Sequence, residues 1–400
     1  MTNPQLKKNA IRFLPVLLNG VRSILSPVLG ILFSYAIVTF FSKELWGDFV
    51  EYLLFFLIVS LINNWGSRTF LMRAFSQNPK NIVTDWQALF MARLPVCMLC
   101  VISVFFFFEF YLTLFMIIWI VSAFVYHSFF SIIFYNREYE KMIAIEMLSF
   151  LALLFLVYLQ RENLSSFVLV QSYAIHVFVK ALVAIIFYPL FFNFKSFQFN
   201  SKLLWISFPF FLLGISGFLQ SKIDIYAYSF YYDGKPLGEY QIISGFFIFS
   251  QSMVMLLIFP YVKNIYRMST KSIDLIRKNS AIYGFVLNSI VVVSIYFALL
   301  LFDIKLSIIQ VILGFMIGYP CYIYTLDILL LFKKHKEYFV IKISIICLGI
   351  NFLVSVLLLH LDYNITGTLA GNAAAQILAL YCYLNLRKTK NVSNNLKIDM

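Results

Sequence analysis

The sequence predicts an all-α polytopic membrane protein whose twelve transmembrane helices form two parallel, pseudo-symmetric lobes of six helices each. The first observation behind this fold class is composition. The 400 residues are 62% hydrophobic and only 12% charged, whereas soluble domains carry about 25% charged residues. The second observation is a succession of apolar segments, each long enough to cross a bilayer. The third is a weak repeat that relates the two halves of the chain.

The first six predicted helices occupy the N-terminal half of the chain. A spanning helix needs about 20 mainly apolar residues, and short polar stretches separate the segments that meet this requirement. In chain order, these segments are residues 13–41, 48–66, 87–108, 112–135, 141–160 and 164–192. We expect them to form an N-terminal lobe over residues 1–192, followed by a cytoplasmic linker over residues 193–202.

The second six predicted helices follow the linker with similar spacing. They are residues 203–230, 240–262, 281–302, 306–332, 338–361 and 365–386. We expect a C-terminal lobe over residues 203–386 and a basic cytoplasmic tail over residues 387–400. Proline inside the longer segments predicts kinks, because its ring removes a backbone donor and clashes with the preceding turn.

The distribution of basic residues predicts the orientation. Lys and Arg accumulate in the cytoplasmic loops of membrane proteins. If the N-terminus is cytoplasmic, most of the 31 basic residues, Arg93 among them, fall on the cytoplasmic side. The outer side holds Lys43, Arg161, Lys235 and Lys305. The pattern therefore predicts two cytoplasmic termini.

Two parts of the sequence repeat at the start of equivalent helices. LWGDF at residues 45–49 opens the second predicted helix, and PLGEY at residues 236–240 opens the eighth. Because each repeat contains an even number of helices, both halves face the same way across the membrane. Parallel repeats of this kind are typical of transporters.

Composition also excludes several classes of function. The net charge of +13 does not indicate nucleic-acid binding, because the basic residues lie in short loops between apolar segments. All five cysteines fall inside apolar runs, where a thiol behaves as a small hydrophobic group. Cys97 and Cys100 form a CxxC pair with no further ligand nearby. The sequence therefore predicts no metal site and no cofactor.

Local sequences add a resemblance that covers the whole chain in helix number, size and lobe symmetry. They are SKELWGDF at 42–49, GSRTFLMR at 66–73, Glu140-Lys141, SKID at 221–224 and GEY at 238–240. The chain resembles the polysaccharide-flippase branch of the MOP superfamily, the Wzx-like carriers of O-antigen or capsule repeat units. It is more distantly similar to lipid II flippases and MATE exporters.

The resemblance implies a transporter of the bacterial inner membrane rather than an enzyme. Its cargo would be an undecaprenyl-pyrophosphate-linked oligosaccharide, moved from the cytoplasmic to the periplasmic leaflet by alternating access. Implied partners are membrane lipids and other polysaccharide-assembly proteins. A MATE-like cation-coupled exporter is the alternative, although it favours acidic cavity residues. A polysaccharide polymerase or ligase would need a larger outer loop than residues 231–239, the longest here.

Charged side chains inside predicted helices are the candidate cargo ligands, since each costs at least about 2.5–3.5 kcal/mol to insert. Arg22 lies near mid-depth of the first helix and Lys222 in the seventh. A guanidinium offers a planar fork of donors that suits phosphate, but a buried structural pair is the alternative for Arg22. Arg68 is expected at the cytoplasmic mouth together with Arg267, or else serves only as a topology signal.

Lys180 and His176 lie one turn apart in the sixth predicted helix. They form a polar stripe that faces the cavity, or Lys180 snorkels to the surface and His176 is an ordinary core residue. Glu146 and Asp327 are expected close to the cytoplasmic face, with Asp327 beside Lys333.

Asp224 is the candidate for ion coupling. In relatives, an acidic residue of the seventh helix and polar residues of the last two helices hold Na⁺. The resemblance therefore implies a coupling-ion site formed by Asp224, Asn351, Ser355 and Thr368. Proton coupling through Asp224 is the alternative, because a hard cation wants several oxygens and at least one carboxylate, and a serine stands here in place of a second carboxylate.

Overall fold

The computed structural model of the protein describes residues 4–193, 200–254, 258, 270–334 and 336–395. Every regular element within these ranges is a helix, and ten helical segments are long and apolar enough to cross a membrane. The two other predicted spans, 240–262 and 365–386, coincide with α10 and α15, although the end of the first lies outside the described residues. The predicted class, an all-helical membrane protein, is confirmed.

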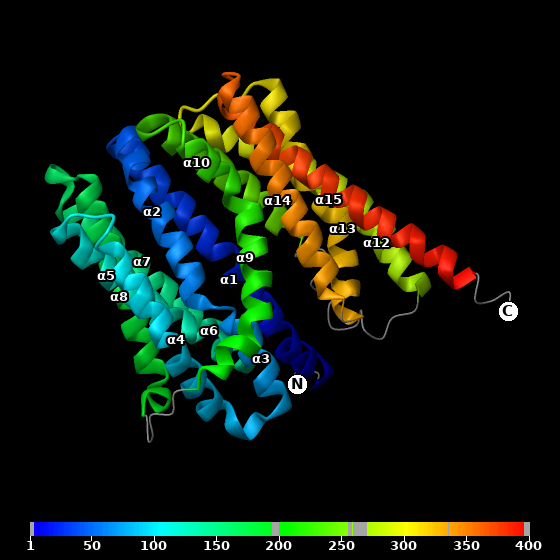
Figure 1. Ribbon diagram of the computed structural model, residues 1–400, viewed down its shortest axis with the longest axis horizontal. Helices are drawn as coiled ribbons and strands as arrows, with labels where there is room; N and C mark the ends of the chain where they lie inside the picture. The colour runs from blue at the N-terminus through cyan, green and yellow to red at the C-terminus, as the bar shows by residue number, and fades with distance from the viewer. Residues whose placement is uncertain (1–3, 194–199, 255–257, 259–269, 335, 396–400) are drawn as a thin grey trace. The chain divides into compact units, whose positions relative to one another are not determined.

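The chain forms two compact units. The first comprises Met1–Ile37 and Asp48–Ile215, and in it α5 and α7 both pack against α8 (Figure 1). Its helices are α1 (Pro4–Phe40), α2 (Lys43–Asn64), α3 (Ser67–Gln77), α4 (Ile82–Val104), α5 (Phe110–Ser128), α6 (Phe130–Asn136), α7 (Tyr139–Leu159), α8 (Ser166–Phe187) and the first part of α9 (Lys202–Ser229). Short 3-10 turns, η1 (Pro79–Asn81), η2 (Arg161–Asn163) and η3 (Pro189–Phe192), join them.

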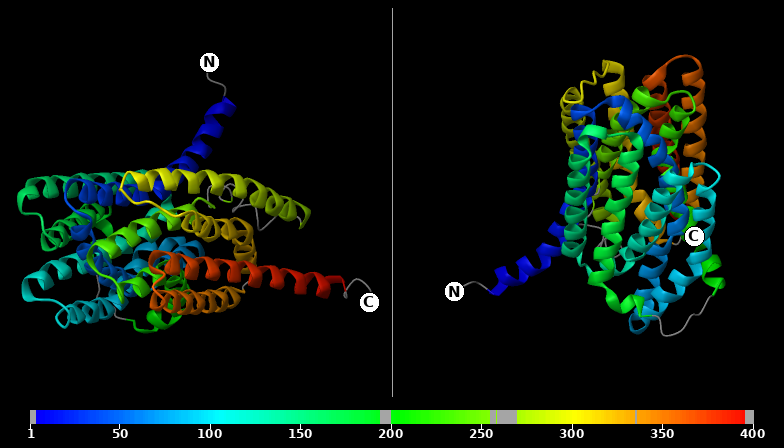
Figure 2. Two further views of the ribbon diagram at one scale, coloured as in Figure 1. Left: turned by 90° about the horizontal axis from the view of Figure 1, so that it is seen from above. Right: turned by 90° about the vertical axis from the view of Figure 1, so that its left-hand side faces the viewer.

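The second unit comprises Val38–Gly47 and Ser216–Met400. Its helices are α10 (Gly234–Ser252), α12 (Thr270–Leu300), α13 (Ile308–Lys333), α14 (Glu337–His360) and α15 (Asn364–Asn395), with the second part of α9. α15 packs against both α13 and α14, and its C-terminal part projects beyond them (Figure 2). Part of the predicted linker, residues 194–199, lies outside the described residues.

A sharp break separates α2 from α3 at the end of the helix that the sequence predicts over residues 48–66. Trp65 and Gly66 both have positive φ, 45° and 65°. A Cβ on Gly66 would lie 2.5 Å from the carbonyl carbon of Phe210, so only glycine permits this approach. Trp65 donates from Nε1 to the Leu204 carbonyl at 3.1 Å and stacks on Phe211 with centroids 4.3 Å apart. The break thus docks the start of α9 against α2.

The two repeated sequences meet in the second unit. A Cβ on Gly47 would lie 1.7 Å from the carbonyl oxygen of Gly234, and one on Gly238 would lie 2.8 Å from the carbonyl oxygen of Lys43. Lys43 also forms an ion pair with Glu239 at 3.0 Å. Equivalent glycines, Gly47 and Gly238, therefore allow the backbones of the first turns of α2 and α10 to come into direct contact.

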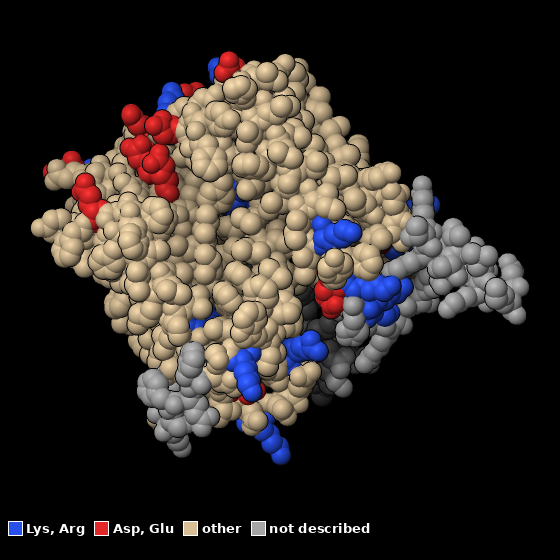
Figure 3. Space-filling model, in the orientation of Figure 1, with Lys and Arg blue, Asp and Glu red and all other residues tan. Residues whose placement is uncertain are grey.

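The described surface is mostly apolar. Large hydrophobic side chains such as Phe106, Trp205 and Ile308 are exposed, and few charged residues interrupt the face shown in Figure 3. A soluble monomer rarely exposes contiguous apolar area on this scale. Lipid contact accounts for it, because a bilayer solvates apolar side chains without cost.

Candidate functional site

Two arginines of the first unit meet at one aromatic ring. The guanidinium carbon of Arg22, on α1, lies 4.6 Å from the ring centroid of Phe134. The guanidinium carbon of Arg68, on α3, lies 4.0 Å from the same centroid. The two carbons are therefore at most about 8.6 Å apart, the sum of these distances. Arg22 is half-buried and Arg68 exposed, so the pair presents two positive charges at one place on α6.

Lys180 and His176 lie on α8 in a different polar cluster. Lys180 Nζ forms an ion pair with Glu146 Oε2 at 2.7 Å, and Tyr126 donates to Glu146 Oε1 at 2.8 Å. His176 Nδ1 lies 2.8 Å from the carbonyl oxygen of Ser149. Glu146 is buried within the first unit. The cluster joins α5, α7 and α8, and its carboxylate neutralises Lys180.

Asp224 is the centre of the polar cluster of the second unit. Its carboxylate is 1% exposed, and Oδ2 accepts hydrogen bonds from Tyr240 at 2.7 Å, Ser244 at 3.2 Å and Asn372 at 3.2 Å. Oδ1 is buried and has no hydrogen-bond donor among the described residues. A buried carboxylate oxygen without a partner is unfavourable, so this oxygen is available to a cation or a proton.

The other residues proposed for the coupling ion lie on α14 and α15. Ser355 donates to Asn351 Oδ1 at 3.2 Å, and Thr368 donates to the Ile365 carbonyl. All three are fully buried. Asp224 itself contacts Asn372 on α15 and two residues of α10, Tyr240 and Ser244, and the sequence did not predict these three partners. Lys222 forms no ion pair within 4 Å among the described residues.

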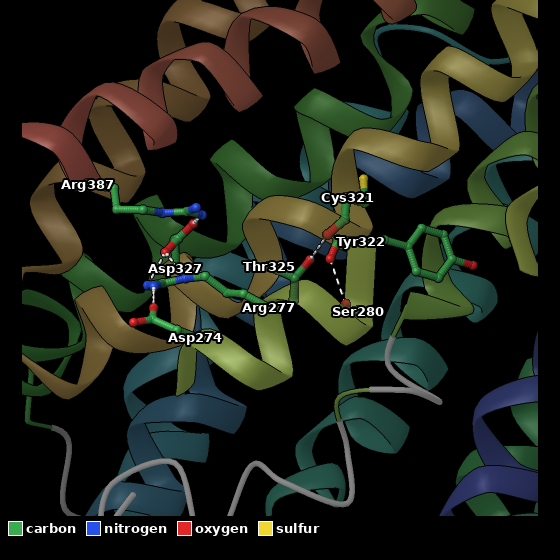
Figure 4. Close-up of polar contacts among 8 residues, drawn as sticks. All are labelled: Asp274, Arg277, Ser280, Cys321, Tyr322, Thr325, Asp327 and Arg387. Carbon is green, nitrogen blue, oxygen red and sulfur yellow. Dashed lines mark hydrogen bonds and ion pairs between the residues drawn. The ribbon is translucent and has the colours of Figure 1, made fainter. Parts of the chain in front are cut away.

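An ion-pair network joins α12, α13 and α15 of the second unit (Figure 4). Asp327 accepts from Arg277 Nη2 at 2.7 Å and from Arg387 Nη2 at 2.5 Å. Arg277 also contacts Asp274 at 2.5 Å. Asp327 is therefore held by residues distant in the sequence, and its prediction as a neighbour of Lys333 missed both arginines.

A polar cluster also lies just outside the apolar helices of the first unit. Glu138 precedes α7, accepts a hydrogen bond from Tyr188 and pairs with Lys141 at 3.1 Å. Burial raises the pKa of the Glu138 carboxyl, but the hydrogen bonds from Tyr188 and Lys141 outweigh burial and leave the pKa below its ordinary value. Burial raises the pKa of Tyr188 above its usual range, and the Glu138 carboxylate adds to this effect.

Sequence reasoning missed one functional candidate altogether. Arg93, counted with the cytoplasmic surface, is 1% exposed inside α4. Its only signal in the sequence is a charge six residues inside the predicted apolar segment 87–108. The structure does not describe Arg267. In the described residues, no group of three or more His, Cys, Asp or Glu side chains could hold a metal ion.

No protein-family model and no curated protein sequence matches the chain, but solved structures share its fold. The lipid II flippase MurJ in an inward closed conformation aligns with a TM-score of 0.68 at 14% identity, over 93% of this chain and 87% of MurJ. An inward-facing MATE multidrug resistance transporter of the MOP superfamily aligns with a TM-score of 0.54 at 10% identity, over 92% and 99%. The chain therefore has the fold of MOP-superfamily transporters.

Proposed function

We propose that this protein is a flippase for an anionic lipid-linked oligosaccharide. The cargo class is an oligosaccharide on undecaprenyl pyrophosphate, such as an O-antigen or capsule repeat unit, moved between leaflets by alternating access. The observation that carries the proposal is the pair of arginines, Arg22 and Arg68, held at one ring. The fold shared with the lipid II flippase MurJ supports it.

The charge arrangement favours a diphosphate over a neutral or cationic cargo. Two guanidinium groups near one point repel each other, and a dianion placed between them relieves that repulsion. Guanidinium binds phosphate oxygens through two parallel hydrogen bonds. Lys180 adds no net charge, since Glu146 neutralises it. A cation exporter would instead require acidic residues at this place.

Asp224 supplies the second half of the proposal. We infer that Asp224, together with Asn351, Ser355 and Thr368, binds Na⁺ or H⁺ and couples its gradient to transport. The unpartnered Oδ1 supports a cation ligand. One carboxylate with neutral oxygens is a weak Na⁺ site by the preference of hard cations for several oxygens, so H⁺ remains the competing ligand.

Location and partners follow from the same proposal. A lipid-linked cargo of this class places the protein in the bacterial inner membrane, with both termini cytoplasmic as the basic loops predict. Membrane lipids surround the exposed apolar helices. The enzymes that build and polymerise the glycan are the proposed functional partners.

Transport by reconstituted protein tests the cargo directly. Proteoliposomes would carry a fluorescent undecaprenyl-diphosphate disaccharide, and its accessibility in the outer leaflet would be measured over time. We expect Arg22→Ala and Arg68→Ala each to slow transfer by at least about tenfold, as loss of a charge-assisted hydrogen bond predicts. Arg22→Lys should restore part of the rate, because Lys keeps the charge without the fork.

Arg73 provides the matched control. It lies on the same α3 as Arg68 and is exposed, so Arg73→Ala changes the net charge by the same amount as Arg68→Ala. Its transfer rate should match the unmodified protein. Equal rates for all variants, or transport of cationic dyes in place of the lipid, would refute the proposal and favour the exporter.

A further inference from the structure

Arg93 lies between two helix breaks of the first unit. On one side, Nη1 donates to the carbonyl oxygens of Asn63 at 3.3 Å and Asn64 at 3.1 Å, and to Ser67 Oγ at 2.9 Å. On the other side, Nη2 donates to Ser128 Oγ. One guanidinium therefore links the end of α2 and the start of α3 to the end of α5.

Arg93 bonds two backbone carbonyls and two serine hydroxyls. The last carbonyls of a helix lack an intrahelical donor, and Arg93 supplies it to Asn63 and Asn64. Ser67 donates its own proton to Asn64 Oδ1 at 2.8 Å, and Ser128 donates to the Phe124 carbonyl at 2.6 Å. Both hydroxyl oxygens are thus oriented to accept from the guanidinium.

Two members of the proposed anion site, Arg68 and Phe134, follow the two breaks. Arg68 is the residue after Ser67, and Phe134 lies on α6 (Phe130–Asn136), which begins just after Ser128. Arg68 and Phe134 meet at 4.0 Å. Any rotation of α3 or α6 at its break would separate them, and the shared contact with Arg93 opposes both rotations.

We propose that Arg93 is a positioning residue, which fixes Arg68 and Phe134 relative to each other so that Arg68 and Arg22 can bind one diphosphate. This inference rests on the proposed function. A role confined to capping the end of α2 would need only the contacts to the Asn63 and Asn64 carbonyls. Arg93 instead directs its donors to both breaks at once, which the point charge of Lys cannot do.

The test uses the full-length protein in detergent and two readouts. The first is the affinity for an undecaprenyl-diphosphate probe, measured by fluorescence anisotropy. The second is hydrogen–deuterium exchange of amides in α3 and α6. The variants are Arg93→Lys and Ser67→Ala, each at one side of the contact. Ser122→Ala is the control, since Ser122 is buried on the same α5 as Ser128 but is not among the four residues that accept a hydrogen bond from Arg93.

The affinity readout is arranged as a double-mutant cycle. Ser67→Ala should weaken binding about tenfold, as expected for one hydrogen bond to a charged group. In an Arg68→Ala background it should have almost no further effect, because Ser67 acts through Arg68. Arg93→Lys should weaken binding at least as much as Ser67→Ala, and Ser122→Ala should leave it unchanged. Equal weakening by Ser67→Ala in both backgrounds would overturn the inference.

The exchange readout separates this inference from the proposed function. Arg93→Lys should speed exchange about tenfold in α3 and α6 and leave α7 and α8 unchanged, since local opening is governed by local contacts. If Arg93→Lys speeds exchange equally in all helices, or leaves the exchange rates unchanged, the positioning role is overturned even if the cargo binds. Failure of the unmodified protein to bind the diphosphate probe overturns the proposed function, and the inference, which requires that cargo, falls with it.

Discussion

Removing Glu146 should destabilise the protein, whereas removing both members of its ion pair should not. Glu146 and Lys180 have side chains only 7% and 14% exposed and lie 2.7 Å apart. Glu146→Gln keeps an oxygen for the Tyr126 hydroxyl but leaves Lys180 charged in an apolar setting. Breaking a buried pair in this way costs about 3–5 kcal/mol, and the slight exposure of Lys180 favours the lower end. The expected loss is therefore about 3 kcal/mol.

The compensating variant is Glu146→Gln with Lys180→Met. Since a buried pair and a neutral apolar replacement differ little in stability, we expect the double variant to unfold within about 1 kcal/mol of the unmodified protein. Transport should persist in it, because Lys180 is already neutralised and adds no charge for cargo. The assay combines unfolding of detergent-solubilised protein, monitored by tryptophan fluorescence, with lipid transfer in proteoliposomes. A stable double variant that no longer transports lipid would refute this reasoning and make Lys180 a cargo ligand.

Three smaller predictions concern packing and charge. Gly371→Ala should cost about 1–3 kcal/mol of stability in thermal unfolding, since its Cβ would lie 2.2 Å from Ser355 Oγ; unchanged unfolding would contradict this packing. Asp327→Asn should lower stability by about 2 kcal/mol, and high salt should reduce the difference. Glu138→Gln should destabilise only where the Glu138 carboxyl is ionised in the unfolded chain. Because the folded pKa is below the ordinary 4.5, the stabilisation is fully present above that pH and lost as pH falls further, which unfolding at graded pH measures.

The sequence predicts the helices well because apolar runs bounded by charge are a strong signal. The predicted span 112–135 matches α5 and α6 taken together, and the span 141–160 matches α7, each within a few residues. Helix breaks are harder to predict. The helix predicted over 48–66 begins earlier in the structure, at Lys43, and is interrupted at Trp65 and Gly66, which both have positive φ. Docking of α9 against Gly66 stabilises that pair, and the sequence does not show which helix docks there.

The candidate site was harder to predict than the fold for a different reason. Helices such as α7 are apolar on all sides, so hydrophobic periodicity does not tell which side faces protein and which faces lipid. Glu146 was therefore placed by depth alone, close to the membrane surface, while its rotation about the helix axis turns it toward Lys180. The cost of burying charge indicates Arg22, and the cytoplasmic end of the second predicted helix indicates Arg68, but nothing in their spacing indicates Phe134.

Polar residues inside apolar helices therefore carry the information on rotation that the apolar residues lack. In a bilayer, an unpaired charge is so unfavourable that its helix must turn it toward a partner. Arg93 illustrates the consequence. Its position deep in α4 requires acceptors on neighbouring helices; Ser67 directly follows the predicted helix 48–66, and Ser128 lies inside the predicted helix 112–135. Matching such donors and acceptors between helices, before any fold is assumed, would have oriented α2, α4 and α5 toward one another.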